Sequence, residues 1–227
     1  MTEAEWLTID NPVLMVRFIR SRTWRKRCLF ICACWESVGE LLTSESSRSA
    51  LAFLEGVAEA KSPHESVDSV ASEVYQIGVA EGEERWGAPW TTETGRFWAV
   101  TLATTAMSDF EEGQSEEEWI RLSDRVNAAG PDAINAWHHL GLDLCNMVRC
   151  IFGNPFRPAI LDPASLTPTV VSLAQAIYAE RDFARLPILA DALEDGGCNQ
   201  ADILGHCRQP SVHARGCWVV DLLLGKE

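Results

Sequence analysis

Apolar residues recur at spacings of three and four along most of the chain, which is the period of an amphipathic helix. The clearest run consists of Trp24, Cys28, Ile31, Trp35, Val38 and Leu42. Leu29, Phe30, Cys32 and Cys34 occupy the other faces of the same stretch, so we expect this helix to be central and covered on more than one side. The pattern predicts an all-α fold, a compact multi-helix domain of short and medium helices with little or no β structure.

A polar capping residue followed by proline marks the expected start of several helices. Asn11-Pro12 opens a helix through about Arg20, and the signal recurs at Asp162-Pro163 and Thr167-Pro168. After Gly130-Pro131, a helix is predicted through Trp137, Leu140, Leu144 and Val148.

The last forty residues or so are densely punctuated. Leu186-Pro187 starts a helix that should end at Gly196-Gly197 with a left-handed cap. Asn199 can cap a helix over Ala201 to Cys207, and Trp218 to Leu224 predicts a final helix or, less favoured, a strand. The 227 residues therefore predict a single helical domain over 1–227, with an Ala-, Ser- and Glu-rich middle at 44–130 and a C-terminal helical segment at 145–227.

The net charge of −14 is unevenly distributed. Residues 1–35 carry six basic and three acidic side chains, whereas residues 36–145 carry six basic and 21 acidic ones. An acidic body repels phosphate backbones, so nucleic-acid binding is disfavoured and a protein partner is the expected kind of partner.

The first ten residues are acidic and polar, which is unlike a secretion signal. The longest apolar run, Cys28 to Trp35, is too short to span a membrane. We therefore expect a cytoplasmic protein without a membrane segment. In that reducing compartment, the eight cysteines should be buried thiols or metal ligands rather than disulfides.

Several long motifs at both ends of the chain carry a resemblance. They are MTEAEWL, RKRCLFICACW, IFGNPFRP, LTPTVVSLAQAIYAERDF, LPILADALEDGGC and HCRQPSVHARGCWVVDLLLGK. Together they resemble an uncharacterised bacterial family that is numerous in planctomycete genomes. The resemblance covers about the first forty residues and everything from about Cys145 onward. It implies no catalytic residue, because that family has no known activity.

The C-terminal segment holds a candidate zinc site. Its potential ligands are Cys198, His206, Cys207, His213 and Cys217, because thiolates and imidazoles are the ligands that zinc prefers. The spacings are loose, however, and no CxxC pair occurs in the chain. The competing and favoured interpretation is that the cysteines are buried as small apolar residues while the histidines cap or pair. No feature indicates any other cofactor.

Catalytic alternatives use the same segment. Asp191, Glu194 and Asp195 could form a carboxylate face beside His206 and His213, and Cys207 with His213 could form a nucleophile pair. Neither arrangement comes with a nucleophile elbow, a glycine-rich phosphate loop or a zincin helix, so no catalytic residue is assigned.

Three arginines are candidates for contact with an anion or a partner: Arg157, Arg208 and Arg215. The favoured alternative is structural, with arginine–carboxylate pairs to Asp191, Asp195, Asp202 or Asp221 that order the turn between Gln209 and Ala214. The sequence as a whole favours a non-catalytic protein-interaction or regulatory module. A metal- or thiol-dependent enzyme using the C-terminal Cys/His residues is the alternative, and an acidic immunity-type inhibitor of a basic toxin is the third hypothesis.

Overall fold

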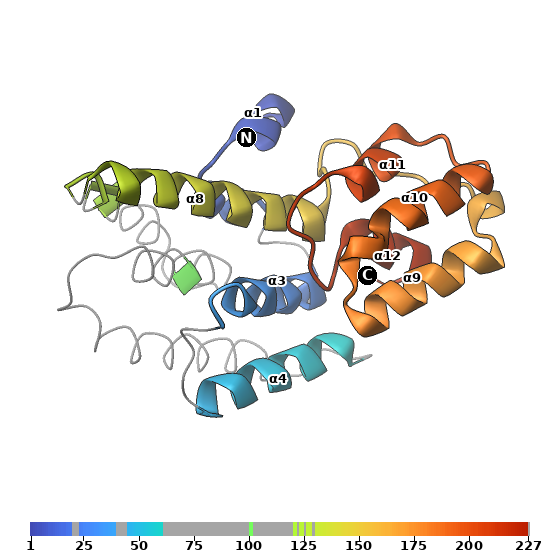
Figure 1. Cartoon of the computed structure of the whole chain (residues 1–227), viewed down its shortest axis with the longest axis horizontal. Coiled ribbons are helices and arrows are strands. Elements are labelled where there is room, and N and C mark those ends of the chain that lie inside the picture. Colours follow the sequence, from blue (N-terminus) through green and yellow to red (C-terminus); the bar gives the residue numbers. More distant parts are fainter. Residues whose placement is uncertain are drawn as a thin grey trace. The chain divides into compact units, whose positions relative to one another are not determined.

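A computed structural model of the chain describes residues 1–19, 23–39, 45–60, 100–101, 120–121, 123–124, 126–128 and 130–226. Every regular element within these ranges is a helix, and Figure 1 shows their course. The predicted all-α fold is therefore confirmed for this part of the chain. Most of the acidic middle at 44–130 lies outside the described residues. None of the described helices is long and apolar enough to cross a lipid bilayer.

The described helices belong to two units, Met1–Val148 and Arg149–Glu227. The sequence pattern, by contrast, indicates one helical domain over the whole chain. The boundary between the units falls close to residue 145, where the C-terminal segment is predicted to begin.

The N-terminal unit opens with two short helices, α1 (Glu3–Thr8) and α2 (Pro12–Ile19). Asn11 caps α2, because its side-chain oxygen accepts hydrogen bonds from the amides of Val13 and Leu14 at 3.0 and 3.4 Å. The start predicted from Asn11-Pro12 is thus confirmed. The predicted last residue, Arg20, lies outside the described residues.

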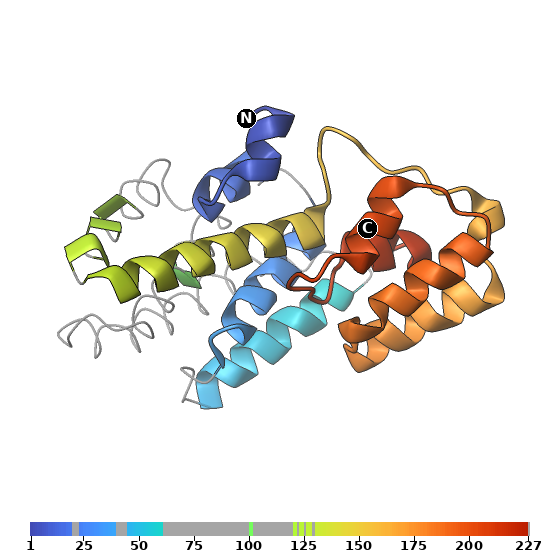
Figure 2. The same cartoon turned by 45° about the horizontal axis from the view of Figure 1, so that its top comes forward.

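Helix α3 (Trp24–Glu36) packs along α4 (Glu45–Glu59), as Figure 2 shows. Every residue from Cys28 to Trp35 is buried, so apolar side chains leave α3 on all of its faces. This confirms the central position that the sequence predicts for this helix. Burial on all faces stabilises the fold, because apolar surface left in water has a free-energy cost that grows with its area.

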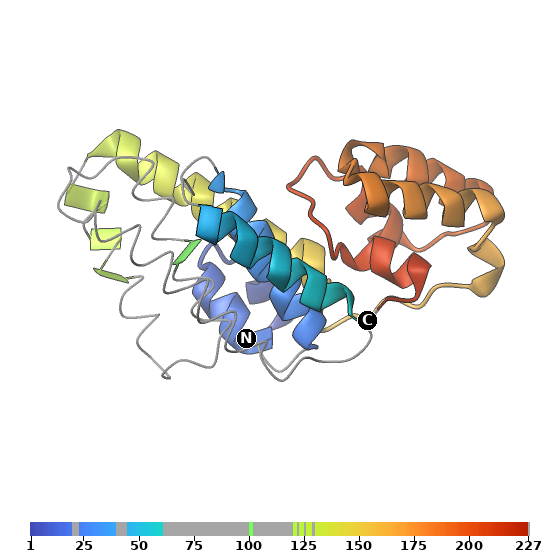
Figure 3. The ribbon, with the colours of Figure 1, turned by 90° about the horizontal axis from the view of Figure 1, so that it is seen from below.

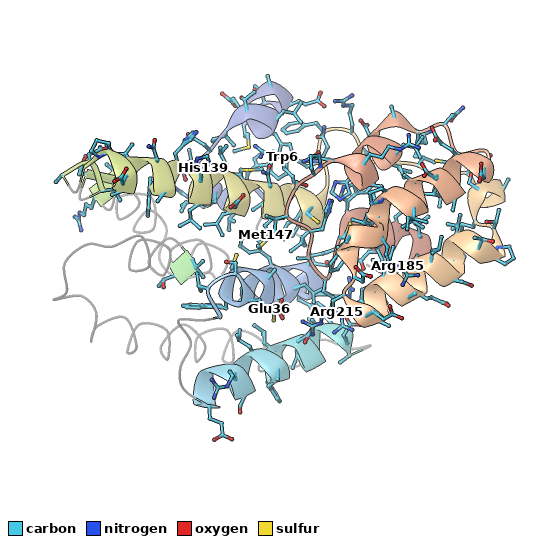
Figure 4. The ribbon with its side chains drawn as sticks, in the orientation of Figure 1. Trp6, Glu36, His139, Met147, Arg185 and Arg215 are labelled. Carbon is cyan, nitrogen blue, oxygen red and sulfur yellow. The ribbon has the colours of Figure 1, made fainter. Side chains whose placement is uncertain are left out.

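Helix α8 (Pro131–Phe152) begins where Gly130-Pro131 predicts it, and Leu140, Leu144 and Val148 are buried. Met147 lies between α8 and α3 (Figure 4), with its sulfur 3.8 Å from Cys34 Sγ. Burial and the neighbouring Cys32 raise the pKa of Cys34 well above its ordinary value. Cys34 is therefore a packing thiol rather than a reactive one.

The C-terminal unit contains the last turn of α8 and four further α-helices. These are α9 (Pro168–Glu180), α10 (Leu186–Asp195), α11 (Ala201–Arg208) and α12 (Trp218–Leu224), with short 3-10 helices η2 at Pro163–Ser165 and η3 at Phe183–Arg185. Helix α10 packs against both α9 and α11, and α12 packs against α9 (Figure 3). Leu186, Leu189, Ala190 and Leu193 form the buried face of α10, at the spacing expected of an amphipathic helix.

The predicted starts at Asp162-Pro163 and Thr167-Pro168 are confirmed. The Asp162 carboxylate accepts from the amide of Ala164 at 2.9 Å, and the Thr167 hydroxyl accepts from the amide of Val170 at 3.3 Å. The residues from Trp218 to Leu224 form a helix, not a strand.

The predicted cap of α11 is wrong. The N-cap residue is Gln200, which makes no side-chain capping bond, and Asn199 lies one residue further out. The capping position is the one next to the first helical residue, and from there a side chain reaches the amide two or three residues on.

Helix α10 ends as predicted at Gly196-Gly197, in a Schellman motif. The amide of Cys198 donates to the carbonyl oxygen of Leu193 at 2.9 Å, and the amide of Gly197 donates to that of Glu194 at 2.8 Å. Gly197 has φ +86°, a conformation that a residue with a Cβ adopts only with strain. The motif also carries the chain from α10 directly toward α11.

We expect Gly197→Ala to lower the free energy of unfolding by about 1 kcal/mol, because the methyl group meets no neighbour and only the backbone conformation is penalised. The matched control is Gly205→Ala in the exposed middle of α11, where a Cβ also meets no neighbour. That change should raise the free energy of unfolding by up to about 1 kcal/mol. Urea unfolding of both variants measures the difference, and equal effects would contradict the left-handed cap.

Candidate metal site

Four side chains in the C-terminal unit converge on one point: Cys150, His206, His213 and Cys217. Cys150 lies in the last turn of α8 and His206 in α11. His213 lies in the loop that follows α11, and Cys217 is the N-cap residue of α12. Two helices, a helix start and a loop thus each supply one ligand atom.

The distances between these atoms suit a tetrahedral metal ion. Cys150 Sγ lies 3.5 Å from His213 Nδ1, and Cys217 Sγ lies 3.2 Å from His206 Nε2. All four ligand atoms lie within 4.8 Å of one another. Zinc bonds of ordinary length would place a sulfur and a nitrogen of one tetrahedron about 3.5 Å apart. The two sulfur–nitrogen distances lie within about 0.3 Å of that value, and every other pair of ligand atoms lies within 4.8 Å.

The hydrogen bond of the His213 ring fits metal binding as well. Its Nε2 lies 3.3 Å from the backbone carbonyl oxygen of Gln209. A carbonyl oxygen can only accept, so Nε2 is the donor of this hydrogen bond and Nδ1 is the nitrogen left to face a metal. Nδ1 is the atom that faces Cys150. Metal-bound histidines commonly have their second nitrogen anchored in this way.

The loop after α11 is bent so that His213 and Cys217 come back toward that helix. The amide of Ser211 donates to the carbonyl oxygen of Gln209 at 2.9 Å, and the amide of Cys217 donates to that of Ala214 at 3.0 Å. Gly216 has φ +92°, which favours glycine at this position. The turn places His213 and Cys217 beside His206, and the His206 and His213 rings meet edge to face with centroids 4.9 Å apart.

The two cysteines of the site are buried, whereas both histidines are half-buried. Burial by itself raises the pKa of Cys217, but hydrogen bonds with Cys150, His206 and His213 lower it well below its ordinary value. Cys207, by contrast, has its pKa raised to about 12 by burial and by the neighbouring Cys217 and Cys198. The unit therefore contains two electrostatically different kinds of cysteine.

Of the five zinc candidates suggested by the sequence, the structure brings together His206, His213 and Cys217. Cys198 and Cys207 are not in this group, although all four cysteines of the unit are buried in its apolar core. For Cys207 the reason is helical geometry: adjacent residues point about 100° apart, so His206 can face the site while Cys207 faces the core. All eight cysteines of the chain are free thiols.

Sequence reasoning did not select Cys150 as a ligand. This residue precedes His213 by 63 positions and lies in the last turn of α8, whereas His213 lies in the loop after α11. The sequence holds only weak indications that Cys150 could be a ligand. It is a cysteine near the end of an amphipathic helix and lies inside the predicted C-terminal segment. No local spacing rule connects it to the other three residues.

The acidic residues considered for catalysis have a structural partner. Arg208 Nη2 donates to Asp191 Oδ1 at 2.8 Å and also to the carboxylate of Glu194. The hydrogen bond from Arg208 lowers the pKa of Glu194. Asp195 is exposed at the end of α10. This carboxylate face is therefore partly neutralised by Arg208, which joins α10 to α11.

The three arginines considered for anion binding have different surroundings. Arg208 bonds to the two carboxylates, whereas the Arg215 guanidinium lies over the Tyr178 ring at 4.8 Å from its centroid. Arg215 is labelled in Figure 4. Arg157 is exposed in the proline-braced loop, and its backbone amide donates to the carbonyl oxygen of Asn154 at 3.2 Å. Arg208 and Arg215 thus have contacts that order the unit.

Compared with models of known protein families, with curated proteins and with solved structures, the chain matches none of them. The family expected from its terminal motifs stays a prediction. The geometry of the four side chains is accordingly the main guide to function.

Proposed function

We propose that the C-terminal unit binds one zinc ion through Cys150, His206, His213 and Cys217, and that this ion has a structural role in a non-catalytic binding protein. The observation that carries the proposal is the convergence of the four ligand atoms within 4.8 Å. Three of them belong to residues 206–217 and the fourth to Cys150 at the end of α8, so local sequence proximity alone does not account for their meeting.

The chemistry of the ligands favours zinc among the common metals. Two thiolates and two imidazoles make a soft and borderline set, which binds zinc well and suits calcium or magnesium poorly. Two thiolates also balance the charge of a divalent ion. A neutral site is favourable here, because both sulfur atoms are buried and an uncompensated charge would be costly.

The number of ligands favours a structural rather than a catalytic role. Four protein ligands complete a tetrahedron and leave no position for a water molecule or a substrate. A thiol-dependent reaction has little support too, since the pKa of Cys207 is raised to about 12 and its side chain is buried. Binding is therefore better supported than catalysis.

The metal would supply stability that a small core lacks. The unit spans residues 149–227, and domains below about 80 residues commonly rely on a metal or disulfides in addition to their core. Zinc would join the end of α8, helix α11 and the start of α12. A cytoplasmic location fits this role, because reducing conditions keep both thiols available for the metal.

The loop between α8 and η2 exposes two large apolar side chains. Ile160 is 78% exposed and Phe156 is 37% exposed, both in the loop between α8 and η2. Exposed large apolar side chains on an ordered loop are compatible with a protein partner. We therefore keep a protein-interaction or regulatory role as the function that the zinc-stabilised unit serves.

The first test is metal content. We expect the purified full-length protein to contain one zinc ion per chain by elemental analysis. Cys150→Ala should lower the zinc affinity by about 100-fold or more, because outer-shell changes alone already cost 10- to 100-fold.

Cys207→Ala is the matched control, since it removes a buried cysteine of the same unit that does not face the site. It should retain full zinc content. Loss of zinc from Cys207→Ala and retention by Cys150→Ala would refute the assignment of ligands.

The second test is stability after zinc removal. We expect a chelator to lower the melting temperature of the full-length protein, with recovery when zinc is added back. A ligand present at 1,000 times its dissociation constant stabilises the folded state by about 4 kcal/mol. Circular dichroism at increasing temperature measures the shift.

His206→Ala should melt at the same temperature with and without the chelator. His139→Ala, an exposed histidine on α8, should keep the response of the parent protein. A parent protein whose melting temperature is unaffected by the chelator would argue against a structural metal.

A further inference from the structure

Trp218 lies against two of the segments that carry the metal ligands. Its ring centroid is 5.3 Å from that of His206, with the two planes inclined by 52°. On another side the indole meets Gly153: a Cβ built on that glycine would lie 3.2 Å from Trp218 Cγ. Gly153 follows Cys150 by three residues, and Trp218 directly follows Cys217.

We infer that Trp218 is a positioning residue for the metal site, which holds the His206 ring with Nε2 directed at Cys217. This inference rests on the proposed zinc site and identifies what prearranges it. One side chain thereby links the segments of three ligands: Cys150 through Gly153, His206 by ring contact, and Cys217 through the backbone.

The geometry around His206 explains why such a support is needed. Its imidazole is half-buried, so the core alone does not fix its orientation. The ring is instead held between the indole of Trp218 and the edge-to-face contact with His213. A ligand that is held to within a fraction of an ångström loses less freedom when the metal binds, and the affinity rises accordingly.

Gly153 provides the space that Trp218 occupies. It is buried and has φ +68°, just after the end of α8. Any side chain there would press on the indole at less than ordinary contact distance, and the backbone would also be strained. Gly153 and Trp218 therefore act as a pair: the absent side chain of one makes room for the ring of the other.

The test measures zinc affinity in full-length variants by competition with a chromophoric chelator. Trp218→Leu should weaken zinc binding about 10- to 100-fold, the range expected when a supporting residue of a metal site is lost. Trp218→Phe retains a flat ring and should recover most of that loss. Trp137→Leu changes another half-buried tryptophan, on α8 in the N-terminal unit, and should bind zinc like the parent protein.

A second readout separates positioning from general stability. With cobalt(II) in place of zinc, Trp218→Leu should alter the intensity of the visible absorption bands, which depends on the arrangement of the ligands, while Trp137→Leu should not. Gly153→Ala should weaken zinc binding as well, because it displaces the indole without removing it. This variant keeps the inference testable if Trp218→Leu fails to fold.

The outcomes distinguish this inference from the proposed function. If the parent protein binds one zinc ion and Trp218→Leu and Gly153→Ala bind it equally tightly, the positioning role is refuted while the zinc site stands. If the parent protein binds no zinc, both are refuted. Weaker binding by both variants, with partial recovery in Trp218→Phe, supports the inference.

Discussion

The convergence of two sulfur and two nitrogen atoms in the C-terminal unit is the constraint on which the interpretation of this protein depends. The pKa of Cys217 is held well below its ordinary value by its hydrogen-bond partners, and a thiolate in an apolar core is costly unless an opposite charge compensates it. The four groups converge on one point. Here they meet within 4.8 Å, and the turn through Gly216 brings two of them back toward α11. A divalent ion would be coordinated by all four groups at once.

The same unit uses cysteine in two ways. All four of its cysteines are buried in the apolar core, but only Cys150 and Cys217 also face the cluster of possible ligands. Direction of the side chain, not residue type, decides between these roles. His206 and Cys207 show this most clearly, since they are adjacent in α11 and yet one faces the ligand cluster while the other faces the core.

The charged residues around the site complete the unit. Arg208 forms ion pairs with Asp191 and Glu194 and so connects α11 to α10. The cationic groups of Arg215 and Lys226 both lie over the ring of Tyr178. Exposed ion pairs of this kind contribute little individually. Arg208 and Arg215 lie near the two ends of the loop that carries His213, and their contacts join these ends to α10 and to Tyr178 of α9. Core, ion pairs and ligand cluster therefore act on the same short stretch.

The sequence by itself determined the helices. Apolar periodicity predicted the buried α3, and local signals predicted the caps at Asn11 and Thr167 and the glycine stop of α10. These features depend on contacts within a few residues. Only the tertiary structure decided which four side chains converge, because Cys150, at the end of α8, is 63 residues from His213 in the loop after α11. A local pattern specifies which face of a helix is apolar, but it does not specify which distant side chain that packing brings alongside.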